Sequence, residues 1–203
     1  MIAGATDGHV WYSRHTTNNP NPVFATGEKL RAAGQALTLM GSGGHARTFI
    51  CDWNNDGKKD LIVADSNGWL TWFSNSGTDA APVLDAGQRI SAAGAPIDRG
   101  GRSSVLVADW NNDGKKDVVF ADEDNGFVWF QNTGTDASPT LAAPKALSIS
   151  LSPRPNLGSF VDWNGDGKTK VRLFRQCFFW LLDTNGNGVL QHEVDQTLAF
   201  GGV

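Results

Sequence analysis

The chain alternates short apolar segments with turns that are rich in glycine, asparagine and aspartate. In its most regular section the apolar segments span 46–53, 60–66, 69–75 and 83–92. They are rich in Val, Ile, Phe and Trp, which favour β-strands, and no stretch of useful length shows the 3.6-residue period of a helix. Asn67-Gly68 is a typical turn pair between two of them. The pattern predicts an all-β fold of short antiparallel strands.

An internal repeat organises these strands. The motif DWNNDGKKD occurs at 52–60 and again at 109–117, and a related segment, DWNGDGKTK, begins at Asp162. Four antiparallel strands that recur at a period near 50 residues are typical of the blades of a β-propeller. We therefore predict one β-propeller, or part of one, over 1–203, because the competing β-sandwich needs no such repeat. The expected blade-like four-stranded repeats are 1–44, 45–101, 102–156 and 157–203.

The first repeat is incomplete. Its segments 2–8, 9–15 and 22–32 match the second, third and fourth strands of the other repeats. After Phe200 only Gly-Gly-Val follows, which is too short to supply the missing innermost strand. A propeller normally closes so that no strand edge stays unpaired. We expect either a four-bladed ring with three strands in its first blade or, as the favoured interpretation, two chains that join into an eight-bladed ring.

Composition narrows the class of protein. The 203 residues include 17 basic and 21 acidic side chains, a net charge of −4 without a basic stretch, so nucleic acid is a poor candidate partner. No apolar run approaches the roughly 20 residues of a membrane helix. Cys51 and Cys177 each lie in an apolar run, and we expect two buried thiols rather than a disulfide. The N-terminal segment has neither the basic nor the apolar region of a secretory signal.

The repeated acidic loop is the strongest chemical motif. A hard cation such as Ca²⁺ takes six to eight oxygen ligands, and three carboxylates within nine residues repel one another unless a cation lies between them. The loop offers oxygens at positions 1, 3, 5, 7 (the backbone carbonyl) and 9. These are Asp52, Asn54, Asp56, Lys58 and Asp60 in one loop and Asp109, Asn111, Asp113, Lys115 and Asp117 in the next. The alternative is a solvated acidic turn, in which Asn and Gly serve only the left-handed backbone.

The third loop is degraded. Asp162, Asn164 and Asp166 keep the first three ligand positions, whereas Lys170 stands where the closing aspartate would be. An ammonium group there would itself neutralise the loop, so metal binding at this loop is left open. An EF-hand is excluded as the framework, because its twelfth position requires a glutamate and here holds Val63.

The segments DWNNDGKKDLIVAD and DWNNDGKKDVVFAD resemble the FG-GAP/VCBS repeat of integrin-α-like propellers and of many secreted bacterial proteins. The resemblance covers nearly all of the chain and weakens at Lys170. It implies that each loop joins the first and second strands of a blade and holds structural calcium. Some members of that family are lectins, and others are non-catalytic modules of adhesins and of polysaccharide-degrading enzymes.

Catalytic motifs are missing from the sequence. No nucleophile elbow, phosphate loop, zinc-protease motif or zinc-spaced Cys/His cluster occurs. Asp65 and Asp122 follow the second strand at equivalent positions, where we expect them to cap a turn. None of the histidines recurs at the matching position of another repeat; they are His9, His15, His45 and His192. We therefore expect no enzyme.

Aromatic residues are the candidate ligand contacts, because the C–H faces of sugars pack on aromatic rings. Trp53, Trp110 and Trp163 occupy position 2 of the three loops, and the alternative is that they pack against a neighbouring blade. We expect a calcium-stabilised, non-catalytic, extracellular module that binds carbohydrate. The alternatives are a structural or protein–protein adhesion module and, less favoured, part of a polysaccharide-degrading enzyme. The expected partners are a carbohydrate or an extracellular protein, and a second copy of the chain.

Overall fold

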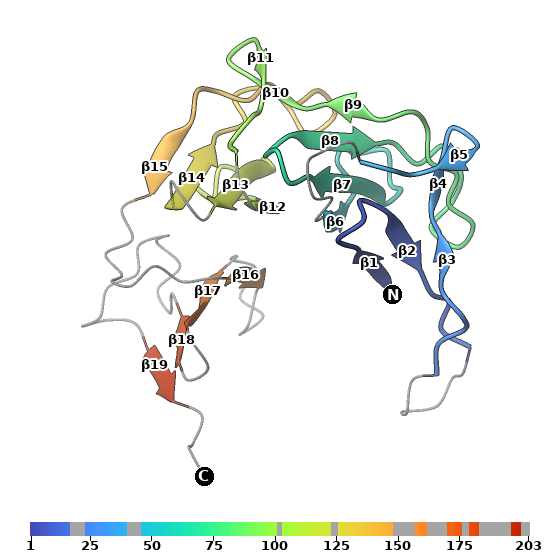
Figure 1. Ribbon diagram of the computed structural model, residues 1–203. Coiled ribbons are helices and arrows are strands. Elements are labelled where there is room, and N and C mark those ends of the chain that lie inside the picture. Colours follow the sequence, from blue (N-terminus) through green and yellow to red (C-terminus); the bar gives the residue numbers. More distant parts are fainter. Residues whose placement is uncertain are drawn as a thin grey trace. The chain divides into compact units, whose positions relative to one another are not determined.

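The structure is a computed structural model of the 203-residue chain. It describes residues 1–16, 23–39, 46–100, 103–122, 126–147, 157–161, 170–175, 179–182 and 196–199. These residues form strands and turns, with no helix among them (Figure 1). They belong to two compact units, Met1–Ser103 and Ser104–Val203, and each unit is described by itself.

The first unit contains two antiparallel sheets of consecutive strands. The three-stranded sheet consists of β1 (Ile2–Gly4), β2 (Val10–Tyr12) and β3 (Glu28–Lys29), in that order. The four-stranded sheet consists of β6 (Arg47–Cys51), β7 (Asp60–Ala64), β8 (Leu70–Phe73) and β9 (Gln88–Arg89), also in chain order. Cys51 pairs with Asp60, so the acidic loop is the connection between β6 and β7. The place of the loop between a first and a second strand is the one that the sequence predicted.

Two small hairpins form separate two-stranded sheets. They are β4 (Arg31–Ala32) with β5 (Gln35–Ala36), and β10 (Ser91–Ala92) with β11 (Ala95–Pro96). Each turns through an Ala-Gly pair with positive φ, 50° at Ala93 and 82° at Gly94 in the second hairpin. The first hairpin also links the two repeats, because the backbone N–H of Ala33 donates to the carbonyl of Leu84 over 2.8 Å.

A hydrophobic core joins the two sheets of the first unit. β7 and β8 contribute Leu61, Val63 and Phe73, of which Val63 is completely buried. Val10 of β2 is also completely buried in the same cluster. The other buried members are Leu37, Leu39, Ala46 and Leu84. Since its members come from both repeats, the first three-stranded sheet is stabilised by packing on the second repeat.

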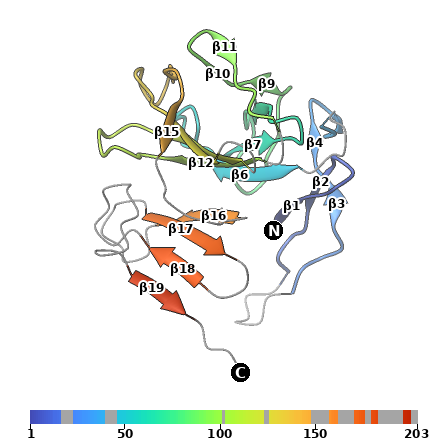
Figure 2. The same cartoon turned by 60° about the vertical axis from the view of Figure 1, so that its left-hand side comes forward.

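The second unit repeats the four-stranded pattern twice. One sheet consists of β12 (Ser103–Ala108, which begins at the boundary), β13 (Asp117–Asp122), β14 (Gly126–Phe130) and β15 (Lys145–Leu147). The other consists of β16 (Leu157–Val161), β17 (Lys170–Arg175), β18 (Phe179–Leu182) and β19 (Gln196–Ala199). Figure 2 shows these last four strands side by side in chain order.

The all-β, antiparallel expectation is therefore confirmed. The strand predicted over 83–92 is wrong as a single strand: Leu84 makes an isolated bridge to Asn75, β9 pairs with β8 over two residues only, and the chain then leaves for the β10–β11 hairpin. No helix with the length and hydrophobicity of a membrane span occurs in the described part of the chain. Cys51 is half-buried, and Cys177 lies outside the described residues.

Candidate metal-binding loops and an adjoining pocket

The loop between β6 and β7 closes on its own backbone. The carboxylate of Asp52 accepts hydrogen bonds from the N–H of Asp56 (3.0 Å to Oδ1) and of Gly57 (2.9 Å to Oδ2). Oδ1 of Asn54 accepts the same Asp56 N–H over 3.2 Å. Asn55 and Gly57 have φ values of 60° and 84°, the left-handed region that Asn and Gly adopt most readily. Positions 1 and 3 of the loop therefore hold their oxygens close together.

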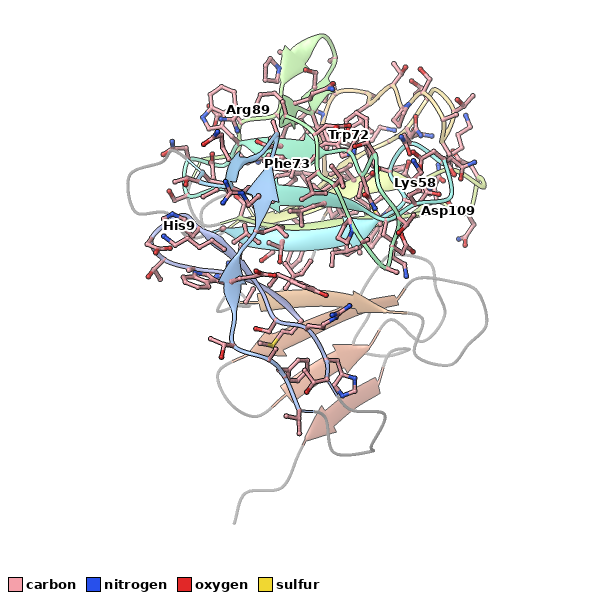
Figure 3. All side chains as sticks on the ribbon, turned by 90° about the vertical axis from the view of Figure 1, so that its right-hand side faces the viewer. His9, Lys58, Trp72, Phe73, Arg89 and Asp109 are labelled. Carbon is pink, nitrogen blue, oxygen red and sulfur yellow. The ribbon has the colours of Figure 1, made fainter. Side chains whose placement is uncertain are left out.

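The loop between β12 and β13 has the same geometry. Asp109 accepts from the N–H of Asp113 at 3.0 Å and from that of Gly114 at 2.8 Å. Asn111 accepts the Asp113 N–H over 3.1 Å, and Asn112 has a φ of 59°. Figure 3 labels Lys58 in the first loop and Asp109 at the start of the second. Because every one of these bonds lies within seven residues, one sequence motif produces one local structure twice.

The fifth position of each loop carries a stabilised negative charge. The backbone N–H of Lys58 donates to Asp56 and lowers the pKa of that carboxyl below its ordinary value. The side-chain amide of Asn111 donates to Asp113 over 2.9 Å and lowers its pKa in the same way. Both carboxyls are exposed and ionised at neutral pH, which is the state that a cation requires.

The ninth position is different, because its carboxylate is buried. Asp60 is 1% exposed, and its two oxygens accept hydrogen bonds from the N–H of Trp53 (3.1 Å) and of Asn75 (2.8 Å). Asp117 is fully buried and accepts from the N–H groups of Trp110 (3.2 Å) and Asn132 (2.7 Å). In both repeats this aspartate ties the acidic loop to the segment that follows the third strand.

The donor chemistry of the loop fits a hard cation at its first, third and fifth positions, which provide carboxylate and amide oxygens. Across the described ranges, no group of three or more His, Cys, Asp and Glu side chains is gathered as a metal centre. The ninth aspartate is directed to two backbone amides in each repeat. The predicted ligation by Asp60 and Asp117, and by the carbonyls of Lys58 and Lys115, stays a prediction.

The other site residues predicted from the sequence differ in burial, and some of them lie outside the described residues. Trp53 is 4% exposed, so its ring has no open face for a sugar and the packing alternative fits it. Trp110 is half-buried. Asp65 caps the turn after β7 as predicted, since its Oδ1 accepts from the N–H of Asn67 (3.0 Å) and of Trp69 (3.1 Å). The residues Asp162, Trp163, Asn164 and Asp166 lie outside the described residues.

A pocket of about 260 Å³ lies in the first unit, beside the acidic loop. Its polar side chains are Lys59, Asp60, Asn75 and Asp79. Two of these residues are joined directly, because the Lys59 N–H donates to Asp79 over 2.7 Å. The apolar and aromatic lining consists of Met1, Ile2, Tyr12, Leu30, Ile50, Leu61, Pro82 and Leu84. The pocket is therefore lined mainly by apolar residues, with a few polar side chains among them, and is built from both repeats of the unit.

Asn75 is a buried polar residue at the pocket that the sequence did not mark as a candidate. It is 1% exposed, and its Oδ1 accepts hydrogen bonds from the N–H groups of Gly77 and Val83, both at 3.0 Å. Its Nδ2 is buried and donates to no group of the described residues. The signal in the sequence is the recurrence of an asparagine at the same position, Asn132, in the next repeat.

Burial of Asp117 gives a pH prediction. Loss of water raises the pKa of this carboxyl, and the Asn132 amide opposes the shift only in part. The folded protein then holds this proton more tightly than the unfolded chain, so the contribution of Asp117 to stability falls as the pH rises from its ordinary pKa through the raised one. Urea unfolding of wild type and Asp117→Asn in EDTA, between about pH 4 and 7, isolates this group. The prediction is contradicted if the free energy of unfolding of the wild type, minus that of the variant, grows as the pH rises.

Comparison with protein families matches the model of the FG-GAP-like repeat at residues 52–120 and 109–171, which together cover more than half of the chain. Comparison with curated proteins finds no match. Among solved structures, the chain is similar to a lectin of Agrocybe aegerita that is described as recognising non-reducing terminal N-acetylglucosamine. The TM-score is 0.50 at 22% identity, over 95% of this chain and 47% of the lectin, so the chain spans about half the length of that protein.

The family match contains both complete acidic loops and the strand that follows each, and the structure gives the two loops the same hydrogen bonds. The likeness to the lectin, at its low identity, supports the fold alone. This chain belongs to the family of FG-GAP-like repeat proteins.

Proposed function

We propose that this protein is a non-catalytic carbohydrate-binding module whose repeats are stabilised by calcium and arranged as propeller blades. The observation that carries the binding function is the pocket beside the acidic loop of the second repeat, with its mixed apolar and polar lining. The apolar and aromatic lining, which includes Tyr12, suits the C–H face of a sugar ring, and the polar side chains of the lining offer partners for its hydroxyl groups. The FG-GAP-like repeats and the lectin among the similar folds support this choice of ligand.

Calcium would be held by the first, third and fifth residues of each complete loop and by the carbonyl of the seventh. Those residues are Asp52, Asn54, Asp56 and Lys58, and Asp109, Asn111, Asp113 and Lys115. A bound cation supplies positive charge between carboxylates that otherwise repel one another. Since such sites work at the high calcium concentration outside cells, we place the protein in an extracellular setting.

We expect calcium to raise the melting temperature. A ligand that binds only the folded state at a hundredfold excess over its Kd adds about 2.7 kcal/mol per site, which amounts to several degrees for a chain of this size. Thermal melts in excess calcium and in EDTA measure the shift, and Asp113→Ala should reduce it more than Asp166→Ala in the degraded loop. Identical melts with and without calcium would end the proposal for the metal.

Carbohydrate binding is tested on a glycan array that includes glycans with terminal N-acetylglucosamine, the sugar for which the similar lectin is described as specific. Specific binding in calcium supports the module. Binding to matrix proteins in a pull-down, with an empty array, would favour the adhesion alternative. Cleavage of a polysaccharide would overturn the non-catalytic assignment.

The first sheet suggests an assembly. It has three strands, whereas the sheet of the second repeat has four. We propose that two chains associate so that strand edges are paired within a larger ring. Light scattering at micromolar concentration should give twice the 21.7 kDa of one chain. A stable species of 21.7 kDa would rule out this assembly.

A further inference from the structure

We propose that one face of the first repeat is the surface to which a second copy of this chain binds. This surface, called the outer face below, consists of Ala3, Trp11, Ser13 and Phe24. The inference deepens the assembly proposed above and rests on it for the association of two chains. It adds the surface that associates, and it does not depend on carbohydrate binding.

Three of these residues share one side of the first sheet. Ala3 of β1 pairs directly with Trp11 of β2, and directly paired residues of an antiparallel sheet point to the same side. A Cβ atom at Gly27 would lie 3.1 Å from the hydroxyl of Ser13 and 3.6 Å from the ring of Trp11. The side chains of Trp11 and Ser13 therefore lie together, beside Ala3.

The second repeat has the same face, at an offset of 60 positions. Val63 of β7 pairs with Thr71 of β8, as Ala3 does with Trp11. A Cβ atom at Gly87 would lie 2.6 Å from the ring of Phe73 and 2.8 Å from the methyl group of Thr71. The register and the close contacts of the two sheets therefore agree, and their faces can be compared residue by residue.

In the second repeat this face is an interface between repeats. Val63, Thr71 and Phe73 are 0%, 7% and 6% exposed. Val63, Phe73 and Leu84 belong to one hydrophobic cluster with three residues of the first repeat, Val10, Leu37 and Leu39. The carbonyl of Leu84 also accepts the N–H of Ala33 from the first repeat. A preceding repeat thus covers this face by apolar packing and by a backbone hydrogen bond.

In the first repeat the equivalent face is open. Ala3 is exposed, and Phe24 is 44% exposed, whereas its counterpart Leu84 is 7% exposed. The two are equivalent because Phe24 bridges to His15 as Leu84 bridges to Asn75. Trp11 is half-buried, and tryptophan is enriched among the residues that contribute most to binding between proteins. The outer face therefore has the position and the apolar character of an interface between repeats.

The occupant that fits this face best is another repeat of the same kind. Within this chain a repeat covers the equivalent face of the second sheet, so a second copy carries sheets of the required type. The chain also matches 47% of the length of a lectin of similar fold, so two copies provide about the length of one such fold. Closed association of identical chains is the common form of assembly in soluble proteins.

The test is sedimentation of wild type and of two arginine variants from nanomolar to micromolar concentration. We expect wild type to form a species of twice 21.7 kDa. Ala3→Arg places a long charged side chain on the outer face and should raise the Kd of the dimer at least about tenfold. The matched control is Ala80→Arg, at an exposed position in the turn after β8 of the second repeat, which should leave the Kd unchanged within about twofold.

Circular dichroism shows whether each variant folds. If Ala3→Arg does not fold, Phe24→Lys serves instead, because that side chain is 44% exposed on the same face, and we expect a similar loss of affinity. A dimer that both arginine variants leave intact, or weaken equally, would overturn the inference and keep the proposed assembly. A species of 21.7 kDa at every concentration would overturn both. Neither result affects the carbohydrate-binding proposal, which the glycan array tests separately.

Discussion

Replacement of Asp60 by alanine is expected to lower the free energy of unfolding by about 3–5 kcal/mol. The carboxylate accepts the N–H groups of Trp53 and Asn75 at a position that is 1% exposed. Alanine leaves both amides buried without a partner, and each such group costs about 1–3 kcal/mol. The change also leaves a void between the loop and the segment after β8.

Urea unfolding in EDTA and in calcium measures this effect and separates two roles of Asp60. A loss of similar size in both conditions means that the carboxylate acts by holding the two amides. A loss that appears only in calcium would mean that it acts chiefly as a metal ligand. Asp79→Ala is the control, because the Asp79 side chain is 45% exposed and water replaces it at the Lys59 N–H, with an expected change below about 1 kcal/mol.

Replacement of Gly68 by alanine is expected to cost about 2–4 kcal/mol. Gly68 lies in the turn between β7 and β8 with a φ of 83°, a conformation that costs other residues about 1–2 kcal/mol. A Cβ atom there would also lie 2.2 Å from the backbone nitrogen of Gly100 and 2.8 Å from backbone atoms of Arg99. Backbone atoms cannot move aside as the end of a flexible side chain does, so the turn and the 98–100 segment must separate.

Gly94 is the matched control for this prediction. It has nearly the same φ, 82°, but a Cβ atom at Gly94 meets nothing within 4 Å. Gly94→Ala therefore carries the backbone strain without the steric conflict, and we expect a loss of about 1–2 kcal/mol. Thermal and urea unfolding of the two variants give the difference, which measures the close approach of Gly68 to Gly100. Equal losses would show that this approach is absent in solution.

The local parts of the fold are readable from the sequence, because their contacts are local. Asp52, Asn54 and Asp56 bond to amides within the same loop, and the motif that contains them is repeated almost letter for letter. The strands β7 and β8 follow from runs of β-branched and aromatic residues on either side of a Gly-containing turn. The sequence prediction was wrong over 83–92, where a single apolar run is divided between two strands that pair with different partners.

The tertiary structure decided the parts that depend on distant contacts. In the sequence, Asp60 is marked as a metal ligand like the other acidic residues of its loop. In the structure its carboxylate accepts a hydrogen bond from the N–H of Asn75, fifteen positions away across the β7–β8 hairpin. Trp53, for which the sequence left open a ligand contact or a packing role, is 4% exposed.

The sequence by itself thus determined the all-β class, the family and the acidic loops, because short hydrogen bonds and strand propensity act within a few residues. Only the tertiary structure decided which polar groups are satisfied. The pocket combines Tyr12 of the first repeat with Asn75 of the second, so neither repeat forms it alone. Such a pocket depends on how residues that are distant in the sequence pack together, which the pattern within one repeat does not determine.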